Sequence, residues 1–300
     1  MACNLDLLTS FKDNCGFGLL ASIDNKPTHK NLEDAVTSLS RMMHRGAVAA
    51  DGKTGDGSGL LLSMPKSFFE KELASNGVDI PEKYAVAMVF SNNESDFDTM
   101  ESICKNNDLK VVYAREVPVN TAALGAQALE SLPTIKQLFV VADSPVANER
   151  LDALVYLSRK EIETKLQDDT TFYIPSFSTT VISYKGLVMP THIKDFYTDL
   201  ASEDFKISFC LFHQRFSTNT LPQWKLAQPF RSIAHNGEIN SVTANRFNVK
   251  MKMAAVKSGI FSDEEMSKLT DVIQDGMSDS ASLDNFMEFL QVNGVDFFKA

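Results

Sequence analysis

The spacing of apolar residues predicts a helix near the start of the chain. Apolar side chains recur at steps of three or four from Leu32 to Met43, Asn31 precedes them as a candidate N-cap, and Gly46 follows as a stop signal. These features predict a helix over residues 32–44. The same periodicity predicts helices over residues 146–166, 240–255 and 280–291.

Short apolar runs, rich in β-branched and aromatic residues and bounded by turn residues, indicate buried strands. They lie at residues 59–64, 84–90, 138–142, 180–184 and 208–212. Strands and helices are mixed without regular βαβ alternation. This favours an α+β fold, with sheet packed on sheet or helices on one face, over a doubly wound parallel sheet. The apolar ending at residues 296–300 leads us to expect a truncated chain.

Composition excludes several classes of protein. The 300 residues carry 29 Lys and Arg against 39 Asp and Glu, a net charge of −10, and no basic block that would follow a nucleic-acid backbone. No apolar run approaches the roughly 18 residues that span a bilayer, and the first ten residues lack the features of a signal peptide. We therefore expect no nucleic-acid or membrane partner.

Cysteine and histidine spacing argues against structural metal or disulfides. The four cysteines show no C-x-x-C spacing, and the five histidines never stand four residues apart. We expect reduced thiols, a cytoplasmic location and no metal site. The Gly-rich segment 51–59 resembles a phosphate loop, but Ala47 stands where the first glycine is required. A Gly-rich loop or hairpin is the better interpretation.

Cys15 admits two interpretations. It precedes a strand-like run and is flanked by small residues, which is typical of a buried structural cysteine. Alternatively it is a nucleophile, but a thiol of pKa about 8.5 needs a base, and no histidine is near in sequence. Cleavage between Asn14 and Cys15 would supply that base as a terminal amine of pKa about 7.7–8.0.

Two later motifs also have an ordinary and a chemical interpretation. Arg215 follows an apolar strand, where it is either a surface or ion-paired residue or a bidentate clamp for a carboxylate. Asn236 and Gly237 lie between an expected short strand at 232–234 and a helix. They form either a turn or a pair of donors, one side-chain amide and one backbone N–H, for a developing oxyanion.

Helix ends supply the remaining candidates. Asp279 stands at the start of the helix predicted over residues 280–291, where it is either part of an ordinary N-cap or a carboxylate that holds a substrate ammonium. Arg45 and Gly46 close the helix predicted over residues 32–44. A basic residue and a glycine are common there for structural reasons alone.

Taken together, these segments resemble a known family. They are DNCGFGLLA at 13–21, RMMHRGAVAADGKTGDGSGLLL at 41–62, YKGLVMPT at 184–191, CLFHQRFSTNTLPQWKLAQPFRSIAHNGEIN at 210–240 and SDSASLDN at 278–285. The set, in this order, is similar to the amino-terminal glutaminase domain of the glutamate synthase large subunit, a class II glutamine amidotransferase with an N-terminal-nucleophile fold. Each motif is weak alone, but together they are specific.

The resemblance implies a four-layer αββα sandwich, self-processing that removes residues 1–14, and a glutamine amidotransferase domain over residues 15–300. It also implies a role for each candidate residue. Cys15 attacks the amide of L-glutamine, Asn236 and Gly237 stabilise the oxyanion, Arg215 takes the α-carboxylate, Asp279 takes the α-ammonium, Thr218 gives a supporting contact, and Arg45 with Gly46 lines the surroundings of the nucleophile.

In this family a second half of the protein, the synthase half, uses cofactors and partners that residues 1–300 do not provide. That half binds FMN and an iron–sulfur cluster and converts 2-oxoglutarate and ammonia into glutamate, and a small electron-donating subunit is a further possible partner. No cluster-binding cysteines occur here, so the segment needs no cofactor and is at most a glutaminase. Two alternatives stay open: a class II amidotransferase that feeds another acceptor, and an unprocessed, non-catalytic glutamine-binding module.

Overall fold

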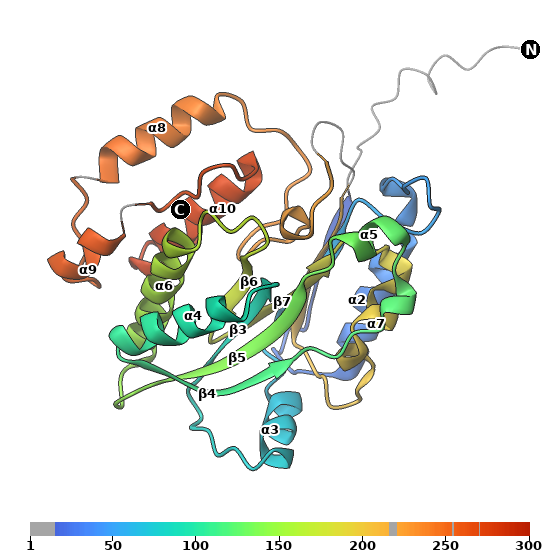
Figure 1. Cartoon of the computed structure of the whole chain (residues 1–300), viewed down its shortest axis with the longest axis horizontal. Helices are drawn as coiled ribbons and strands as arrows, with labels where there is room; N and C mark the ends of the chain where they lie inside the picture. Colours follow the sequence, from blue (N-terminus) through green and yellow to red (C-terminus); the bar gives the residue numbers. More distant parts are fainter. Residues whose placement is uncertain (1–15, 216–220, 254, 270) are drawn as a thin grey trace, which may run out of the picture.

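The computed structural model describes residues 16–215, 221–253, 255–269 and 271–300 of the chain (Figure 1). Its strands form two four-stranded sheets in which every pairing is antiparallel. The first sheet has the order β1 (Gly16–Ala21), β8 (Phe209–Gln214), β2 (Ser58–Ser63), β7 (Val181–Gly186). The second has the order β4 (Leu109–Glu116), β5 (Thr134–Ala142), β3 (Ala85–Ser91), β6 (Tyr173–Ser178).

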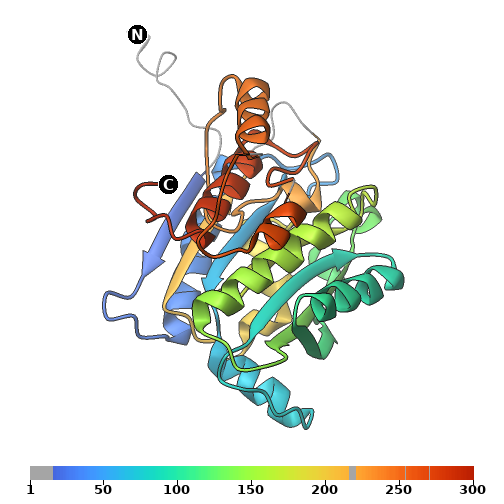
Figure 2. The same cartoon turned by 90° about the vertical axis from the view of Figure 1, so that its left-hand side faces the viewer.

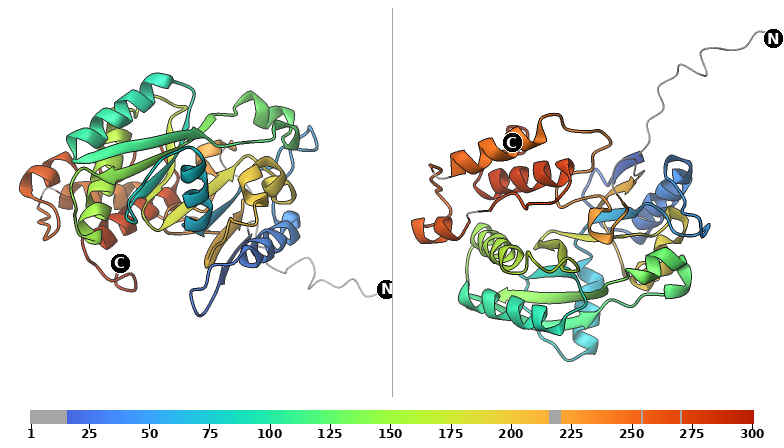
Figure 3. Two further views of the ribbon diagram at one scale, coloured as in Figure 1. Left: turned by 90° about the horizontal axis from the view of Figure 1, so that it is seen from below. Right: turned by 45° about the horizontal axis from the view of Figure 1, so that its top comes forward.

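Helices cover the two sheets from opposite sides. Helices α2 (His29–Arg41) and α7 (Ile193–Phe196) lie on one side, and α4 (Glu94–Asn106) and α6 (Asn148–Lys165) lie on the other (Figures 1 and 3). The layers therefore follow the order helix, sheet, sheet, helix. This confirms the α+β class and the sandwich architecture, and it excludes a doubly wound parallel sheet.

The remaining helices lie outside these layers or at their ends. They are α3 (Lys66–Ser75), α5 (Ala126–Glu130), α8 (Val242–Met253), α9 (Asp263–Lys268) and α10 (Asp279–Val292). Helix α10 lies alongside α6 (Figure 2), and apolar residues such as Tyr156 and Phe289 pack between them. None of the described helices combines the length and apolar composition that crossing a membrane requires.

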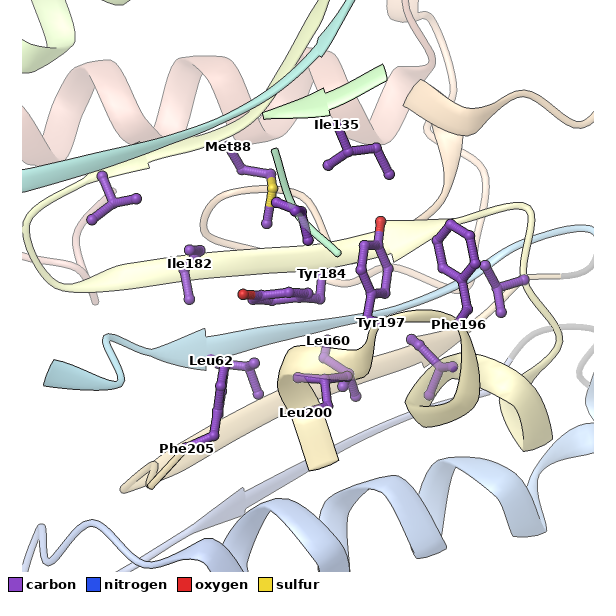
Figure 4. Packing of buried hydrophobic residues seen from close by; sticks show 14 of the residues in the cluster. Leu60, Leu62, Met88, Ile135, Ile182, Tyr184, Phe196, Tyr197, Leu200 and Phe205 are labelled. Carbon is purple, nitrogen blue, oxygen red and sulfur yellow. The ribbon is translucent and has the colours of Figure 1, made fainter. Parts of the chain in front are cut away.

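The largest apolar cluster joins the two sheets. Alternate residues of β2 and β7, such as Leu60 and Tyr184, belong to it together with Met88 of β3, and Phe196 and Tyr197 come from the α7 segment (Figure 4). Strand side chains alternate between faces, so the other residues of β3 face α4 and α6 in a second cluster. Strand β3 is thus buried on both faces, which explains its unbroken apolar sequence.

Most of the predicted elements are present. The strands predicted at 59–64, 84–90, 138–142, 180–184 and 208–212 are confirmed as β2, β3, β5, β7 and β8, and the helices predicted at 146–166, 240–255 and 280–291 as α6, α8 and α10. The first helix begins earlier than predicted, because the side chain of Thr28, rather than Asn31, caps it by accepting the N–H of Asn31.

The Gly-rich segment forms a tight turn, as predicted. Val48 and Gly55 make an isolated antiparallel bridge, and between them Asp51 accepts the backbone N–H groups of Lys53 and Thr54. Gly57, which follows the bridge, has a φ of +122°, a conformation that is strained for other residues. The segment then leads directly into β2.

Candidate active site

Strand pairing brings the start of β1 beside the end of β8. Gly16, the first described residue, pairs with Gln214, the last residue of β8. The next residue, Arg215, donates its backbone N–H to the carbonyl oxygen of Gly57 at 2.9 Å. Two of the predicted site residues, Cys15 and Thr218, lie outside the described residues.

The turn after α2 contributes Arg45 and Gly46 to the same end of the sheet. A Cβ atom placed on Gly16 would lie 3.4 Å from Cβ of Arg45. A Cβ atom on Gly46 would lie 1.7 Å from Nε2 of Gln214 and 3.1 Å from the carbonyl oxygen of Arg215. Glycine is therefore required at position 46 by the close approach of the β8 terminus. Gly46 thus lies against the backbone of Arg215, and Arg45 lies beside Gly16.

A second group of predicted residues lies on the loop that leads into α8. Asn236 is half-buried and Gly237 is exposed. The expected short strand at 232–234 is wrong: no residue of this segment belongs to a strand. Instead the carboxylate of Asp284, on α10, accepts the backbone N–H groups of Ser232 and Ile233 at 2.7 and 3.2 Å. A side chain therefore satisfies the donors that a sheet would otherwise pair.

The loop backbone next to Asn236 is held by a side-chain amide. Oε1 of Gln228 accepts the backbone N–H of His235 at 2.8 Å, and Nε2 of Gln228 donates to the His235 carbonyl oxygen at 3.2 Å. Nδ1 of His235 also lies 2.9 Å from Oγ of Ser280. His235, which precedes Asn236, is therefore held through both its backbone and its side chain.

Asp279 connects this loop to α10. Its Oδ2 accepts the backbone N–H of Ile239 at 2.6 Å, and its Oδ1 accepts the N–H of Ser280 at 2.6 Å. Ser278, and not Asp279, is the N-cap, because its hydroxyl accepts the N–H of Ala281. The carboxylate of Asp279 thus lies against the Asn236 loop, and its oxygens have lone pairs for further donors.

His213 links the two groups. It is fully buried on β8, two residues before Arg215, and its Nε2 lies 3.1 Å from Oδ1 of Asn236. The pKa of His213 is lowered to about 4, chiefly by burial; hydrogen bonds to the His235 backbone and the Asn236 side chain oppose this shift, and the charge of Arg215 adds to it. His213 is therefore a neutral imidazole at neutral pH.

Lys185 is a second buried ionisable group near Arg215. Its ammonium lies 4.7 Å from the ring centre of Tyr173 and 4.9 Å from that of Phe230. Burial, together with the charges of Arg231 and Arg215, lowers its pKa well below the usual value, although Asp284 opposes the shift. Sequence reasoning missed His213, Gln228, Lys185 and Asp284 as site residues, although all four stand within the segments that carry the family resemblance.

Among the described residues, no group of three His, Cys, Asp or Glu side chains is arranged to hold a metal ion. The two described cysteines, Cys104 and Cys210, are buried free thiols. Burial raises the pKa of the Cys104 thiol to about 12, with a smaller contribution from Glu101. Neither thiol has the properties of a nucleophile.

Comparison with known proteins defines the class. The family of class II glutamine amidotransferases matches residues 15–300, and the chain therefore belongs to this family. The match begins at Cys15 and includes Asn236, Gly237 and Asp279.

Several similar proteins are glutamate synthases. The chain is 40% identical to the NADH glutamate synthase of Saccharomyces cerevisiae over 300 residues, which cover 94% of this chain and 14% of that protein. It is 38% identical to the large chain of the NADPH glutamate synthase of Azospirillum brasilense (93% and 19% covered) and 35% identical to ferredoxin-dependent glutamate synthase 2 of Synechocystis sp. (96% and 19% covered). The chain thus spans a fifth or less of the length of these relatives.

Proposed function

We propose that this chain is the glutaminase part of a glutamate synthase and hydrolyses L-glutamine to glutamate and ammonia. The proposal rests on the pairing of Gly16 with Gln214, because Cys15 precedes Gly16 and Arg215 follows Gln214. The names of the relatives favour this function over an amidotransferase that feeds another acceptor.

Activation requires cleavage between Asn14 and Cys15, which removes residues 1–14 and leaves a domain over 15–300. The freed amine of Cys15, in its neutral form, takes the proton of the thiol. The thiolate then attacks the side-chain amide carbon of glutamine and forms a tetrahedral oxyanion. The side-chain amide of Asn236 and the N–H of Gly237 donate hydrogen bonds to that oxyanion.

Collapse of the tetrahedral adduct breaks the C–N bond. The protonated amine of Cys15 gives its proton to the leaving nitrogen, ammonia departs, and a thioester remains on Cys15. Water, deprotonated by the same amine, then attacks the thioester and releases glutamate and the thiol. One water is consumed, one ammonia is produced and no redox change occurs.

Five residues hold or surround the substrate. Arg215 pairs its guanidinium with the α-carboxylate, for which its two parallel donors are suited. Asp279 binds the α-ammonium, and Thr218 provides a supporting contact. Arg45, with Gly46, lines the approach to Cys15, which is supported by the proximity of Arg45 to Gly16: a Cβ atom placed on Gly16 would lie 3.4 Å from Cβ of Arg45.

Ammonia passes to a synthase portion that converts 2-oxoglutarate to glutamate. FMN and an iron–sulfur cluster belong to that portion, as the resemblance to glutamate synthases implies. The names of the relatives specify NADH, NADPH or ferredoxin, so the electron donor differs among these relatives. A small electron-donating subunit is a further candidate partner. We assign the chain to the cytoplasm, because its buried thiols at Cys104 and Cys210 are free.

Intact mass and ammonia release test the proposal together. Purified protein should lose the mass of residues 1–14, begin with Cys15 and release ammonia from L-glutamine, alone or with a synthase partner. Cys15→Ala should abolish ammonia release, whereas Cys104→Ala, which removes a buried thiol of raised pKa, should retain it. Retention of residues 1–14 in active protein, or full activity of Cys15→Ala, would contradict the proposal.

A further inference from the structure

The hydrogen bond between His213 and Asn236 joins a fully buried imidazole to the proposed oxyanion donor. His213 is 0% exposed, lies on β8, and places Nε2 3.1 Å from Oδ1 of Asn236. An amide oxygen can only accept a hydrogen bond, so the proton in this contact belongs to the imidazole nitrogen. His213 is therefore the donor and Asn236 the acceptor.

The other imidazole nitrogen supports the same protonation state. Nδ1 of His213 is buried and has no hydrogen-bond partner among the described residues. A doubly protonated ring would bury an N–H donor without a partner, which costs about 1–3 kcal/mol. The lowered pKa of His213 agrees with a neutral ring that carries its single proton on Nε2.

We propose that His213 is a positioning residue that selects the productive orientation of the Asn236 side chain. With Oδ1 bound to the imidazole N–H, the amide turns its Nδ2 hydrogens away from His213. The flipped amide would set its own N–H against the imidazole N–H, donor against donor. His213 thus favours the orientation that presents donors to an oxyanion. This inference rests on the function proposed above for Asn236.

The backbone of the loop has supports that do not involve His213. Gln228 holds His235 by two hydrogen bonds, Ser280 lies 2.9 Å from its imidazole, and Asp279 accepts the N–H of Ile239. Loss of the imidazole therefore leaves the backbone in place and releases the side-chain amide of Asn236. We therefore expect loss of the imidazole to weaken the stabilisation of the transition state. The binding of glutamine by Arg215 and Asp279 should not change.

Two substitutions at position 213 distinguish orientation from packing. His213→Leu fills the space without a donor. His213→Gln restores an amide N–H close to the position of the imidazole Nε2. Loss of one oxyanion donor typically lowers kcat by about 100- to 1,000-fold, so partial misorientation in His213→Leu should lower the kcat of glutamine hydrolysis by about 10- to 100-fold. The KM for glutamine should stay within about twofold, and His213→Gln should recover most of kcat.

A double-mutant cycle completes the test. In an Asn236→Ala background, His213→Leu should change kcat by less than about twofold, because the amide that it orients is gone. A full kcat loss in that background, a raised KM with unchanged kcat, or a His213→Gln variant as slow as His213→Leu would overturn the inference. An active wild type with an unaffected His213→Leu variant refutes only this inference. A wild type that is correctly cleaved yet inactive, both alone and with a synthase partner, refutes the proposed function itself.

Discussion

Oδ1 of Asp284 accepts a hydrogen bond from the backbone N–H of Ser232 at 2.7 Å, and the Asp284 side chain is completely buried. Its Oδ2 accepts the N–H of Arg231 at 3.2 Å. One carboxylate of α10 therefore fixes the segment that leads to Asn236. The loop is positioned from outside the sheet, so its geometry depends on how α10 packs against α6.

Asp284 should make stability depend on pH. Burial raises its pKa to about 6, Glu288 adds to the shift, and Arg231 and the backbone N–H groups oppose it. The folded pKa thus exceeds the ordinary 3.8, so the folded state holds this proton more tightly than the unfolded chain. The contribution of Asp284 to the free energy of unfolding should therefore fall by up to about 3 kcal/mol as the pH rises from about 4 to 6.

Urea unfolding at pH 4.5 and pH 7 of wild type and Asp284→Asn measures this effect. The free energy of unfolding at pH 4.5 minus that at pH 7 should differ between Asp284→Asn and wild type, because the amide does not titrate. Asp98, an exposed carboxylate on α4, supplies the control, since Asp98→Asn should leave the difference unchanged. Identical pH profiles for wild type and Asp284→Asn would show that Asp284 keeps its ordinary pKa.

Glu163 should be essential for stability. Its Oε1 accepts from Arg159 at 2.8 Å and from Arg231 at 2.6 Å, its Oε2 accepts from Lys160 at 3.0 Å, and all four side chains are buried. Glu163→Gln leaves three buried cations without their shared anion. Breaking a buried ion pair costs about 3–5 kcal/mol, so the free energy of unfolding should fall by that order.

The matched control for Glu163 is Glu149, an exposed residue of the same helix α6. Glu149→Gln should change the free energy of unfolding by no more than about 0.5 kcal/mol in the same denaturant titration. A loss below about 1 kcal/mol in Glu163→Gln would indicate that the three cations find other partners.

The elements that the sequence failed to predict are those with mixed polarity. Strand β4 lies at an edge of the second sheet and contains Lys110, Arg115 and Glu116, which break the apolar run. Strand β6 lies at the other edge and contains Pro175, which is tolerated there because an edge strand leaves donors unpaired. Central strands such as β3 were predictable because both of their faces are buried.

The residues of the candidate site likewise include some that the sequence could predict and some that it could not. Arg215, Asn236, Gly237 and Asp279 stand in contiguous motifs, so their chemistry could be proposed before the fold was known. His213 and Asp284 act through partners that are 23 and 52 residues away in the chain. Nothing in the local sequence reports such contacts, because they exist only once β8 and α10 pack against the 231–239 loop.

Gln228 should contribute to both stability and catalysis. Gln228→Ala removes both of its hydrogen bonds to the His235 backbone and leaves a partly buried N–H and carbonyl without them. The free energy of unfolding should fall by about 1–3 kcal/mol. The kcat for glutamine should also fall, because His235 directly precedes the proposed oxyanion donors.

The control for Gln228 is Gln167→Ala, at an exposed glutamine that follows α6, which should change neither the free energy of unfolding nor kcat. Unchanged kcat in Gln228→Ala would mean that the loop keeps its geometry without this support.

Gly46 should tolerate no side chain. Its φ of −117° is open to any residue, so the requirement is purely steric. A Cβ atom would overlap Nε2 of Gln214, which can move aside, and would approach the carbonyl oxygen of Arg215 at 3.1 Å, which belongs to the backbone. In Gly46→Ala the end of β8 must shift by some tenths of an ångström. Because Arg215 is the proposed carboxylate clamp, the KM for glutamine should rise by about tenfold or more, in line with the sensitivity of catalysis to small misplacements.

Gly259→Ala is the matched control, because a Cβ atom there meets nothing within 4 Å and the residue has no positive φ. Steady-state kinetics with glutamine should give the wild-type KM for Gly259→Ala. Both variants should remain folded, since overpacking of this size costs about 1–3 kcal/mol. If Gly46→Ala loses kcat while KM stays constant, the β8 terminus positions the reacting groups and not the substrate carboxylate, and the assignment of Arg215 as the clamp is wrong.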